Sequence, residues 1–148
     1  MLDVNHLMGT YSFPIGIMGF SEIYEYGISA FASVGGDVIG MVSKDLAFIC
    51  IDPLLVEPDY KVTIEDDWKL LLKNTDEKDL VFICMVAIPT SGDITANLAA
   101  PIVLDTKSKI GFQYIMKQNW ENIRFKFDVS KIKGLQELIN FKITKRKT

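Results

Sequence analysis

Short apolar runs separated by turn residues dominate this chain. Residues 46–51 form a continuous apolar run with the length of one strand, and such a run predicts a strand that is buried on both faces. Residues 24–33 and 38–43 carry aromatic and β-branched side chains on either side of a Gly-Gly-Asp turn signal at residues 35–37. The pattern therefore predicts an antiparallel hairpin followed by a buried strand.

Further strand-like segments occupy much of the remaining chain. In residues 123–129 apolar and polar residues alternate, which is typical of a strand with one buried and one wet face. The other predicted strands are residues 11–13, 79–88, 95–104 and 110–116. About seven short strands beside one or two short helices predict a mainly β fold, namely a small antiparallel β-barrel-like or sandwich domain.

Two segments carry helix signals. Thr63 is placed to cap a helix over residues 63–72, with three acids in the first turn, where the helix dipole favours negative charge. Ser130 is placed to cap a second helix over residues 131–139. We expect the tail, residues 142–148, to be solvated and disordered.

The composition is that of one folded domain. The chain has 148 residues, of which 49% are hydrophobic and 24% are charged. The N-terminus has no basic segment ahead of an apolar one, so no signal peptide is predicted. No apolar run approaches the roughly 20 residues that a membrane helix needs, so we expect no membrane span.

The net charge of −3 conceals a strong asymmetry along the chain. Residues 1–60 contain eight acids and one lysine (−7), and residues 61–105 contain eight acids and four lysines (−4). Residues 106–148 contain eleven Lys or Arg and three acids (+8). An acidic body with a basic tail offers two electrostatic faces, and one interpretation is a nucleic-acid-binding small β-barrel protein that uses the basic C-terminal third.

Residues that usually carry catalysis or bind metals are sparse. His6 is the single histidine and has no Ser or Cys motif around it, so no catalytic triad can be assembled. Cys50 and Cys84 lie in separate apolar runs, and we expect buried free thiols there. The glycines of residues 35–40 match no phosphate-binding motif. The sequence therefore predicts no cofactor, no metal site and no enzyme activity, with a hydrolase that uses Cys84 as the enzyme alternative.

Four segments carry a resemblance to a known family. In chain order they are residues 13–20 (FPIGIMGF), 47–60 (AFICIDPLLVEPDY), 95–103 (TANLAAPIV) and 107–113 (KSKIGFQ). The third is the most specific, and with all four in this order the chain resembles the flagellar assembly factor family FliW. The resemblance ends near residue 124, so we expect a FliW-like β domain over residues 1–124 and a basic C-terminal extension over residues 125–148.

The resemblance implies a regulator of bacterial flagellum biogenesis that acts by protein–protein interaction. Proteins of this family bind newly made flagellin, as a chaperone does, and antagonise the RNA-binding translational regulator CsrA, which represses flagellin synthesis when it is free. The implied device is a partner switch that controls flagellin synthesis. We therefore expect a cytoplasmic monomer with flagellin and CsrA as partners, no membrane contact, and nucleic acid reached only indirectly through CsrA.

The acids of the second quarter of the chain are candidates for partner contact. CsrA-type regulators contact RNA phosphates through Lys and Arg, so an antagonist has a physical reason to present acids to them. The predicted partner-binding residues of this group are Glu57, Asp59, Tyr60, Glu65, Asp66 and Asp67. The alternative is a solvated loop and helix N-terminus with no partner.

Two further features are candidates for the same role. The loop of residues 13–20 places Phe13, Ile17 and Phe20 beside permissive glycines. If exposed, this loop is an apolar grip for flagellin, and if buried, it is a core plug. Asn97 is a polar residue within a predicted strand, where its amide can satisfy backbone groups at a bulge or contact a partner. The sequence leaves open which surface takes which partner.

Overall fold

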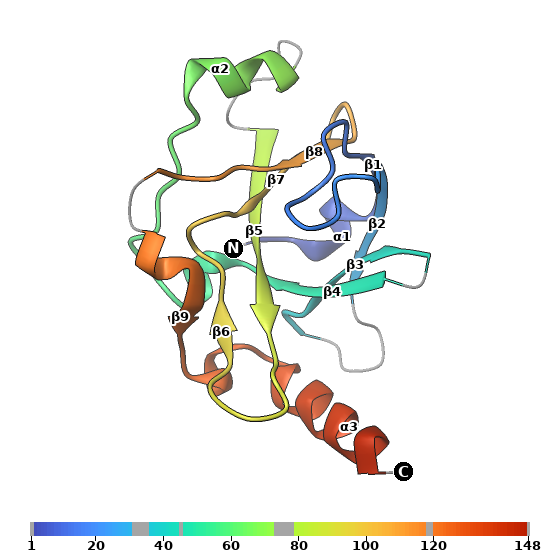
Figure 1. The fold of residues 1–148 in the computed structure, drawn as a ribbon, viewed down its shortest axis with the longest axis vertical. Helices are drawn as coiled ribbons and strands as arrows, with labels where there is room; N and C mark the ends of the chain where they lie inside the picture. Colours follow the sequence, from blue (N-terminus) through green and yellow to red (C-terminus); the bar gives the residue numbers. More distant parts are fainter. Residues whose placement is uncertain (1, 31–35, 45, 73–78, 118–119, 148) are drawn as a thin grey trace.

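One β-sheet organises the chain (Figure 1), and the computed structural model describes residues 2–30, 36–44, 46–72, 79–117 and 120–147. Within those residues its nine strands are β1 (Gly9–Ser12), β2 (Glu25–Ala30), β3 (Ile39–Ser43), β4 (Leu46–Ile51), β5 (Leu80–Ala87), β6 (Thr95–Ala96), β7 (Ile102–Asp105), β8 (Ile110–Gln113) and β9 (Phe125–Lys126). The predicted hairpin is β2 with β3, which pair antiparallel. The predicted buried strand is β4.

The sheet closes into a barrel. Hydrogen-bonded neighbours follow the order β4-β3-β2-β1-β8-β7-β5-β6-β9, and β4 also pairs with β5. This last pairing closes seven strands on themselves and leaves β6 and β9 as a short extension. Neighbouring strands are antiparallel except β1 and β8, which meet in parallel at Ser12 and Ile110. The predicted mainly β, barrel-like fold is confirmed, with one parallel junction that the pattern did not predict.

Short helices surround the barrel. The α-helices of the described residues are α1 (Val4–Leu7), α2 (Asp66–Lys69) and α3 (Leu135–Lys147). The 3-10 turns are η1 (Pro53–Leu55), η2 (Leu70–Leu72), η4 (Trp120–Arg124) and η5 (Val129–Lys131). In Figure 1, α2 and α3 lie at opposite ends of the long axis with the barrel between them. Of the helices described, none has both the length and the apolar character to span a membrane.

The second half of strand β4, Ile49 to Ile51, is buried on both faces, as the sequence predicts for the whole strand, whereas Ala47 is exposed and Leu46 and Phe48 are only partly buried. Successive side chains of a strand point to opposite faces of the sheet. Cys50 belongs to the apolar cluster that fills the barrel, whereas Ile51 belongs to a second cluster outside it, and both side chains are fully buried. The outer wall of the barrel therefore needs a cover of its own.

Two segments cover this outer wall. Trp68 of α2 stacks on Phe112 of β8 with ring centroids 5.5 Å apart, which covers one region. The C-terminal segment covers the region that contains Cys84, and its buried apolar side chains there are Ile132, Leu135, Leu138 and Ile139. The domain boundary at residue 124 stays a prediction, but side chains from beyond it share an apolar cluster with the barrel.

The first predicted helix starts later than expected, and Thr63 does not cap it. Helix α2 begins at Asp66, and Glu65 occupies the N-cap position without a side-chain cap. The cause is Tyr114, whose hydroxyl donates to the Thr63 carbonyl oxygen at 3.1 Å and accepts from the Glu65 N–H at 3.1 Å. These bonds hold the stretch before Asp66 out of the helix.

The C-terminal extension also departs from the prediction. Only β9 of the strand predicted over residues 123–129 pairs with the sheet, because its partner β6 is two residues long. Ser130 caps no helix; instead its N–H donates to Asp128 at 3.0 Å and its Oγ at 2.8 Å, so that Asp128 caps η5. These bonds, the backbone one first, lower the pKa of Asp128. Helix α3 continues through residues 142–147, which were expected to be disordered.

The strand predicted over residues 95–104 is interrupted between β6 and β7. We call the intervening residues 97–101 the break. Because a buried backbone group without a partner is costly, the polar groups of the break must be bonded outside the ladder. Its N–H donors are Asn97 to Met85 O (2.9 Å), Leu98 to Asn122 O (3.0 Å) and Ala100 to the Asn97 Oδ1 (3.0 Å). The side chain of Asn97 thus has the structural role that the sequence suggested for it.

Four carbonyl oxygens of the break are bonded as well. From Leu98 to Pro101, their donors are in order the Tyr60 hydroxyl (2.7 Å), the Met116 N–H (2.9 Å), the Gln113 side-chain amide (3.2 Å) and the Tyr114 N–H (2.9 Å). Gln113 also reaches the loop of residues 13–20, because its Oε1 accepts from the Met18 N–H at 2.8 Å. Only 5% of Gln113 is exposed, so its side-chain amide cannot bond to bulk water and depends on these two hydrogen bonds.

Replacing Gln113 by methionine tests this bridge. The Gln113→Met change keeps the length of the side chain but leaves the buried Ala100 carbonyl oxygen without its donor. We expect the free energy of unfolding to fall by about 2 kcal/mol, measured by chemical denaturation. The control is Gln136→Met on the exposed face of α3, which we expect to change the free energy of unfolding by less than about 0.5 kcal/mol. Equal effects of the two changes would contradict the role of Gln113.

Shortening Leu135 tests whether the C-terminal segment is part of the barrel's core. Leu135 is fully buried in the outer cluster, so Leu135→Ala is expected to destabilise the whole chain by about 2–5 kcal/mol. The neighbouring exposed Glu137→Ala is the control. Thermal unfolding followed by circular dichroism is the measurement, and a melting curve of the Leu135 variant identical to that of the original chain would contradict the shared core.

The thiols offer a test that depends on pH. Burial raises the pKa of Cys50 from 9.0 to about 12 and raises the pKa of Cys84 well above 9.0. Folding therefore favours the protonated thiols, and the stability that this contributes is complete below pH 9 and lost as the pH rises towards 12. At pH 8 we expect a thiol-specific reagent to label both cysteines in denaturant and neither in the native chain. Rapid labelling of the native chain would contradict this burial.

Candidate partner-binding site

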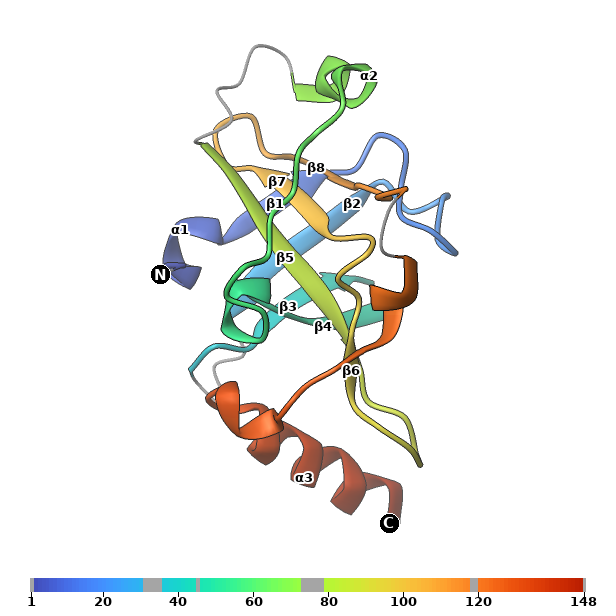
Figure 2. The same ribbon diagram turned by 90° about the vertical axis from the view of Figure 1, so that its left-hand side faces the viewer.

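Residues 57–65 form a crossing segment over the outer face of the barrel. The segment begins with a turn closed by the Tyr60 N–H, which donates to the Glu57 carbonyl oxygen at 3.0 Å. Figure 2 shows this segment passing in front of β5 on its way to α2. Two hydroxyls fasten it, one on Tyr60, which donates to the Leu98 carbonyl oxygen, and one on Tyr114, which bonds both sides of residue 64. Burial raises the pKa of Tyr60 above its usual range, so its hydroxyl stays protonated and remains a donor. The crossing segment is therefore held in one place on the barrel.

A groove of about 680 Å³ runs along the crossing segment. Its lining residues are Glu57, Asp59, Tyr60, Lys61, Thr63, Glu65, Leu98, Tyr114, Met116, Lys117 and Asn122. We call it the acidic groove. The structure thus brings together four of the predicted partner-binding residues on one surface.

The remaining two predicted acids lie elsewhere. Asp66 and Asp67 belong to the first turn of α2 and do not line the acidic groove. Asp66 pairs with Lys69 at 3.6 Å on a well-exposed surface. Within the groove, Glu65 pairs with Lys117 at 3.7 Å, which leaves Glu57 and Asp59 as the acids without an ion pair among the described residues.

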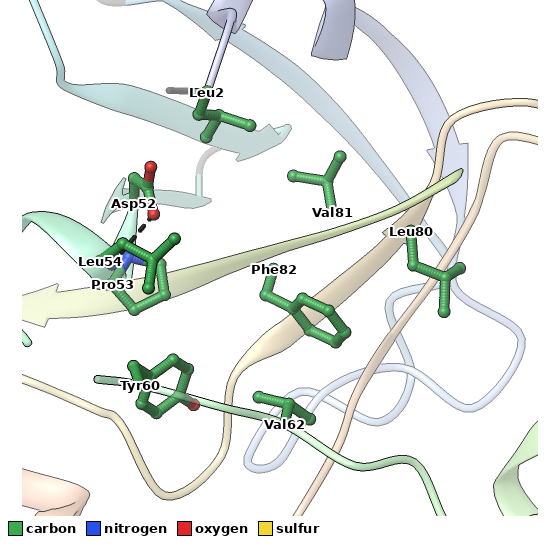
Figure 3. Close-up of a pocket in the computed structure, with 9 residues that line it drawn as sticks. All are labelled: Leu2, Asp52, Pro53, Leu54, Tyr60, Val62, Leu80, Val81 and Phe82. Atoms are coloured by element: carbon green, nitrogen blue, oxygen red, sulfur yellow. Dashed lines mark hydrogen bonds between the residues drawn. The ribbon is translucent and has the colours of Figure 1, made fainter. Parts of the chain in front are cut away.

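An apolar groove of about 330 Å³ adjoins the acidic groove (Figure 3). Its lining residues are Leu2, Asp52, Pro53, Leu54, Tyr60, Val62, Leu80, Val81 and Phe82. We call it the Leu54 groove. Tyr60 lines both grooves, so the two form one continuous surface on either side of the crossing segment. Leu54 is 51% exposed and lines this groove, so its side chain is accessible to a partner.

The loop of residues 13–20 is divided between core and surface. Phe13 is fully buried and Ile17 is 2% exposed, so these two predicted contact residues serve as the core plug. Phe20 is 38% exposed and Met18 is 49% exposed. The apolar grip on the surface is therefore narrower than the sequence suggested and rests on Phe20 and its neighbours.

Phe20 leads into a third groove. Its ring contacts that of Phe48 edge to face, with centroids 5.4 Å apart. Phe48 in turn lines a groove of about 300 Å³, which we call the Phe48 groove, and its lining residues are Phe48, Met85, Val86, Ala87, Thr95, Asn97, Ile123 and Arg124. Asn97, the last predicted contact residue, thus lies on the same surface as Phe20.

The break separates the Phe48 groove from the acidic groove. Asn97 lines the first and Leu98 lines the second, although they are consecutive in the chain. The turn η4 continues this partition, since Asn122 faces the acidic groove and Ile123 faces the Phe48 groove. Residues 97–98 and 122–123 therefore form a short wall, and the two grooves on its two sides differ in chemistry.

Several lining residues were not identified from the sequence. Leu98 lies in the third family segment, and that membership was the available signal for it, whereas Tyr114 directly follows the fourth segment and had only this proximity. Arg124 was identified only as a polar position of the strand predicted over residues 123–129, and Asn122 carried no signal, because only the pairing of β6 with β9 brings η4 beside the break. In the part of the chain that is described, no three metal-ligating side chains gather. The arrangement is suited to binding proteins along grooves.

Comparison with known proteins agrees with these observations. The family model described as FliW protein matches residues 4–127. The chain is 34% identical over 114 residues to the flagellar assembly factor FliW of Treponema denticola, covering 74% of this chain and 76% of that one. It is 32% identical over 118 residues to the FliW of Borrelia hermsii, covering 78% and 91%.

A solved structure extends the similarity to three dimensions. The crystal structure of a flagellar assembly factor FliW superposes with a TM-score of 0.67 at 25% sequence identity, covering 85% of this chain and 86% of that one. The four segments that carried the resemblance all fall within the matched residues 4–127. The chain therefore belongs to the FliW family of flagellar assembly factors.

Proposed function

We propose that this protein binds flagellin and the translational regulator CsrA in the cytoplasm and, as a partner switch, controls flagellin synthesis without catalysing a reaction. Flagellin that is still inside the cell occupies the protein and leaves CsrA free to repress. Export of flagellin returns the protein to CsrA and lifts repression. Membership of the FliW family supports this proposal, and so does the presence of two grooves of different chemistry, the acidic groove and the Phe48 groove.

The acidic groove supports CsrA as one partner. A regulator that contacts RNA phosphates presents Lys and Arg, and unpaired carboxylates attract such a surface. Glu57 and Asp59 supply these carboxylates on the crossing segment. Hydrogen bonds made by the hydroxyls of Tyr60 and Tyr114 hold this segment in place. A rigid surface loses little conformational freedom on binding, so more of the interaction energy appears as affinity.

The Leu54 groove extends the same surface with an apolar contact. Interfaces combine an apolar centre with a polar rim, and charged rims alone contribute little affinity. Because Tyr60 lines both grooves, one partner can place an apolar side chain beside Leu54 and basic side chains beside Asp59. The gathering of exposed acids next to an apolar groove is the observation that carries the proposal.

Reversing one charge in the acidic groove tests the proposal. Asp59 is exposed and its carboxylate makes no bond to the described residues, so Asp59→Lys is expected to leave the fold intact. We expect its affinity for purified CsrA to fall at least about tenfold at low salt, and by less at high salt, where the attraction is screened. Titration calorimetry at two salt concentrations measures both effects.

The matched control is Glu137→Lys, which makes the same charge change on α3, away from the groove. Equal loss of affinity in both variants would show that only net charge matters and would contradict a role of the acidic groove. The proposed function as a whole fails if the original chain co-elutes with neither flagellin nor CsrA in size-exclusion chromatography.

A further inference from the structure

We propose that the Phe48 groove is the flagellin-binding surface, and that it takes an apolar segment of flagellin that carries a carboxylate, which pairs with Arg124. This inference rests on the proposed function and adds to it the assignment of each partner to one surface. It depends on the chemistry of the groove, on an unpaired cation at its rim, and on its separation from the acidic groove.

The floor of the Phe48 groove is apolar. Phe48, Met85 and Val86 come from the neighbouring strands β4 and β5, and all three side chains are partly exposed. Phe20, which is 38% exposed, continues this surface along the loop, since its ring contacts that of Phe48. Apolar side chains of a partner that bind here would therefore bury an apolar surface formed by two family segments.

Arg124 and Asn97 offer hydrogen-bond donors to the groove, and the hydroxyl of Thr95, which can donate or accept, lines it as well. Arg124 is exposed, and no carboxylate among the described residues pairs with it. Its neighbour Lys126 differs, because it pairs with Asp93 at 3.1 Å. The Oδ1 of Asn97 is occupied by the Ala100 N–H, which leaves the amide nitrogen as the end that can bond a partner. Two donors beside an apolar floor are complementary to an apolar segment with a carboxylate.

The same charges argue against CsrA as the occupant. A regulator that presents Lys and Arg to RNA would place cations beside the unpaired Arg124, and like charges at an interface are unfavourable. The lining of the acidic groove has three acids and two lysines, and Glu57 and Asp59, which have no ion pair among the described residues, offer such a partner the opposite sign. Of the two proposed partners, flagellin is therefore the one that the Phe48 groove fits.

Charge reversal at the rim tests the assignment. Arg124→Glu is expected to weaken the binding of purified flagellin at least about tenfold and to change CsrA affinity by less than about twofold. The matched control is Lys126→Glu, which changes the net charge equally but removes a cation that already has a partner, and we expect flagellin affinity to fall by less than about threefold. Calorimetry with each partner gives the affinities, and circular dichroism confirms the fold of each variant.

A second variant probes the apolar contact independently of charge. Phe20→Ala shortens an exposed side chain and is expected to weaken flagellin binding about tenfold while the chain remains folded. The assignment is overturned if both variants bind flagellin as the original chain does, or if either variant loses CsrA instead. If the original chain binds both partners in that experiment, the proposed function stands although the assignment fails, and if it binds neither, the two fail together.

Discussion

The need to bond a buried stretch of backbone shapes this molecule more than any single apolar contact. Between β6 and β7 the chain leaves the named strands for five residues, 97–101, and seven hydrogen bonds hold most of its backbone polar groups. Unpaired groups at this depth would each cost on the order of 1–3 kcal/mol. The residues that make these bonds are therefore fixed in space relative to one another, and Tyr60 and Gln113 among them belong to the second and fourth family segments.

This convergence explains why the four segments resemble the family together. Tyr60 ends the second segment and Gln113 ends the fourth, and both donate to carbonyl oxygens of the third. Gln113 also holds the first segment through the Met18 N–H. Phe13 adds a steric link, because a Cβ at Gly111 would come within 2.5 Å of the Phe13 ring. Each segment thus constrains another, and a change in one requires a compensating change elsewhere.

The sequence predicted those features that depend on near neighbours. The apolar run of residues 46–51 indicated the burial on both faces that Ile49 to Ile51 show. The turn signal at residues 35–37 indicated the antiparallel pairing of β2 with β3, although residue 35 lies outside the described residues. The sequence did not predict that Thr63 would be held extended, because the responsible hydroxyl lies on Tyr114, about 50 positions away in the chain. The sequence also grouped Asp66 with Asp59 as one candidate patch. In the structure Asp66 belongs to the first turn of α2 and does not line the acidic groove, and the local sequence pattern gives no information about this placement.

The placement of the grooves bears on how two partners could exclude each other. Asn97 and Leu98 face different grooves although consecutive Cα atoms lie only about 3.8 Å apart. A stable protein interface covers about 800 Å² on each partner, which is a patch far wider than that wall. Under the proposed assignment, two proteins centred on neighbouring grooves would meet across η4, whatever the shape of either groove. Exclusion would then follow from the thinness of the wall, without any change in the conformation of the barrel.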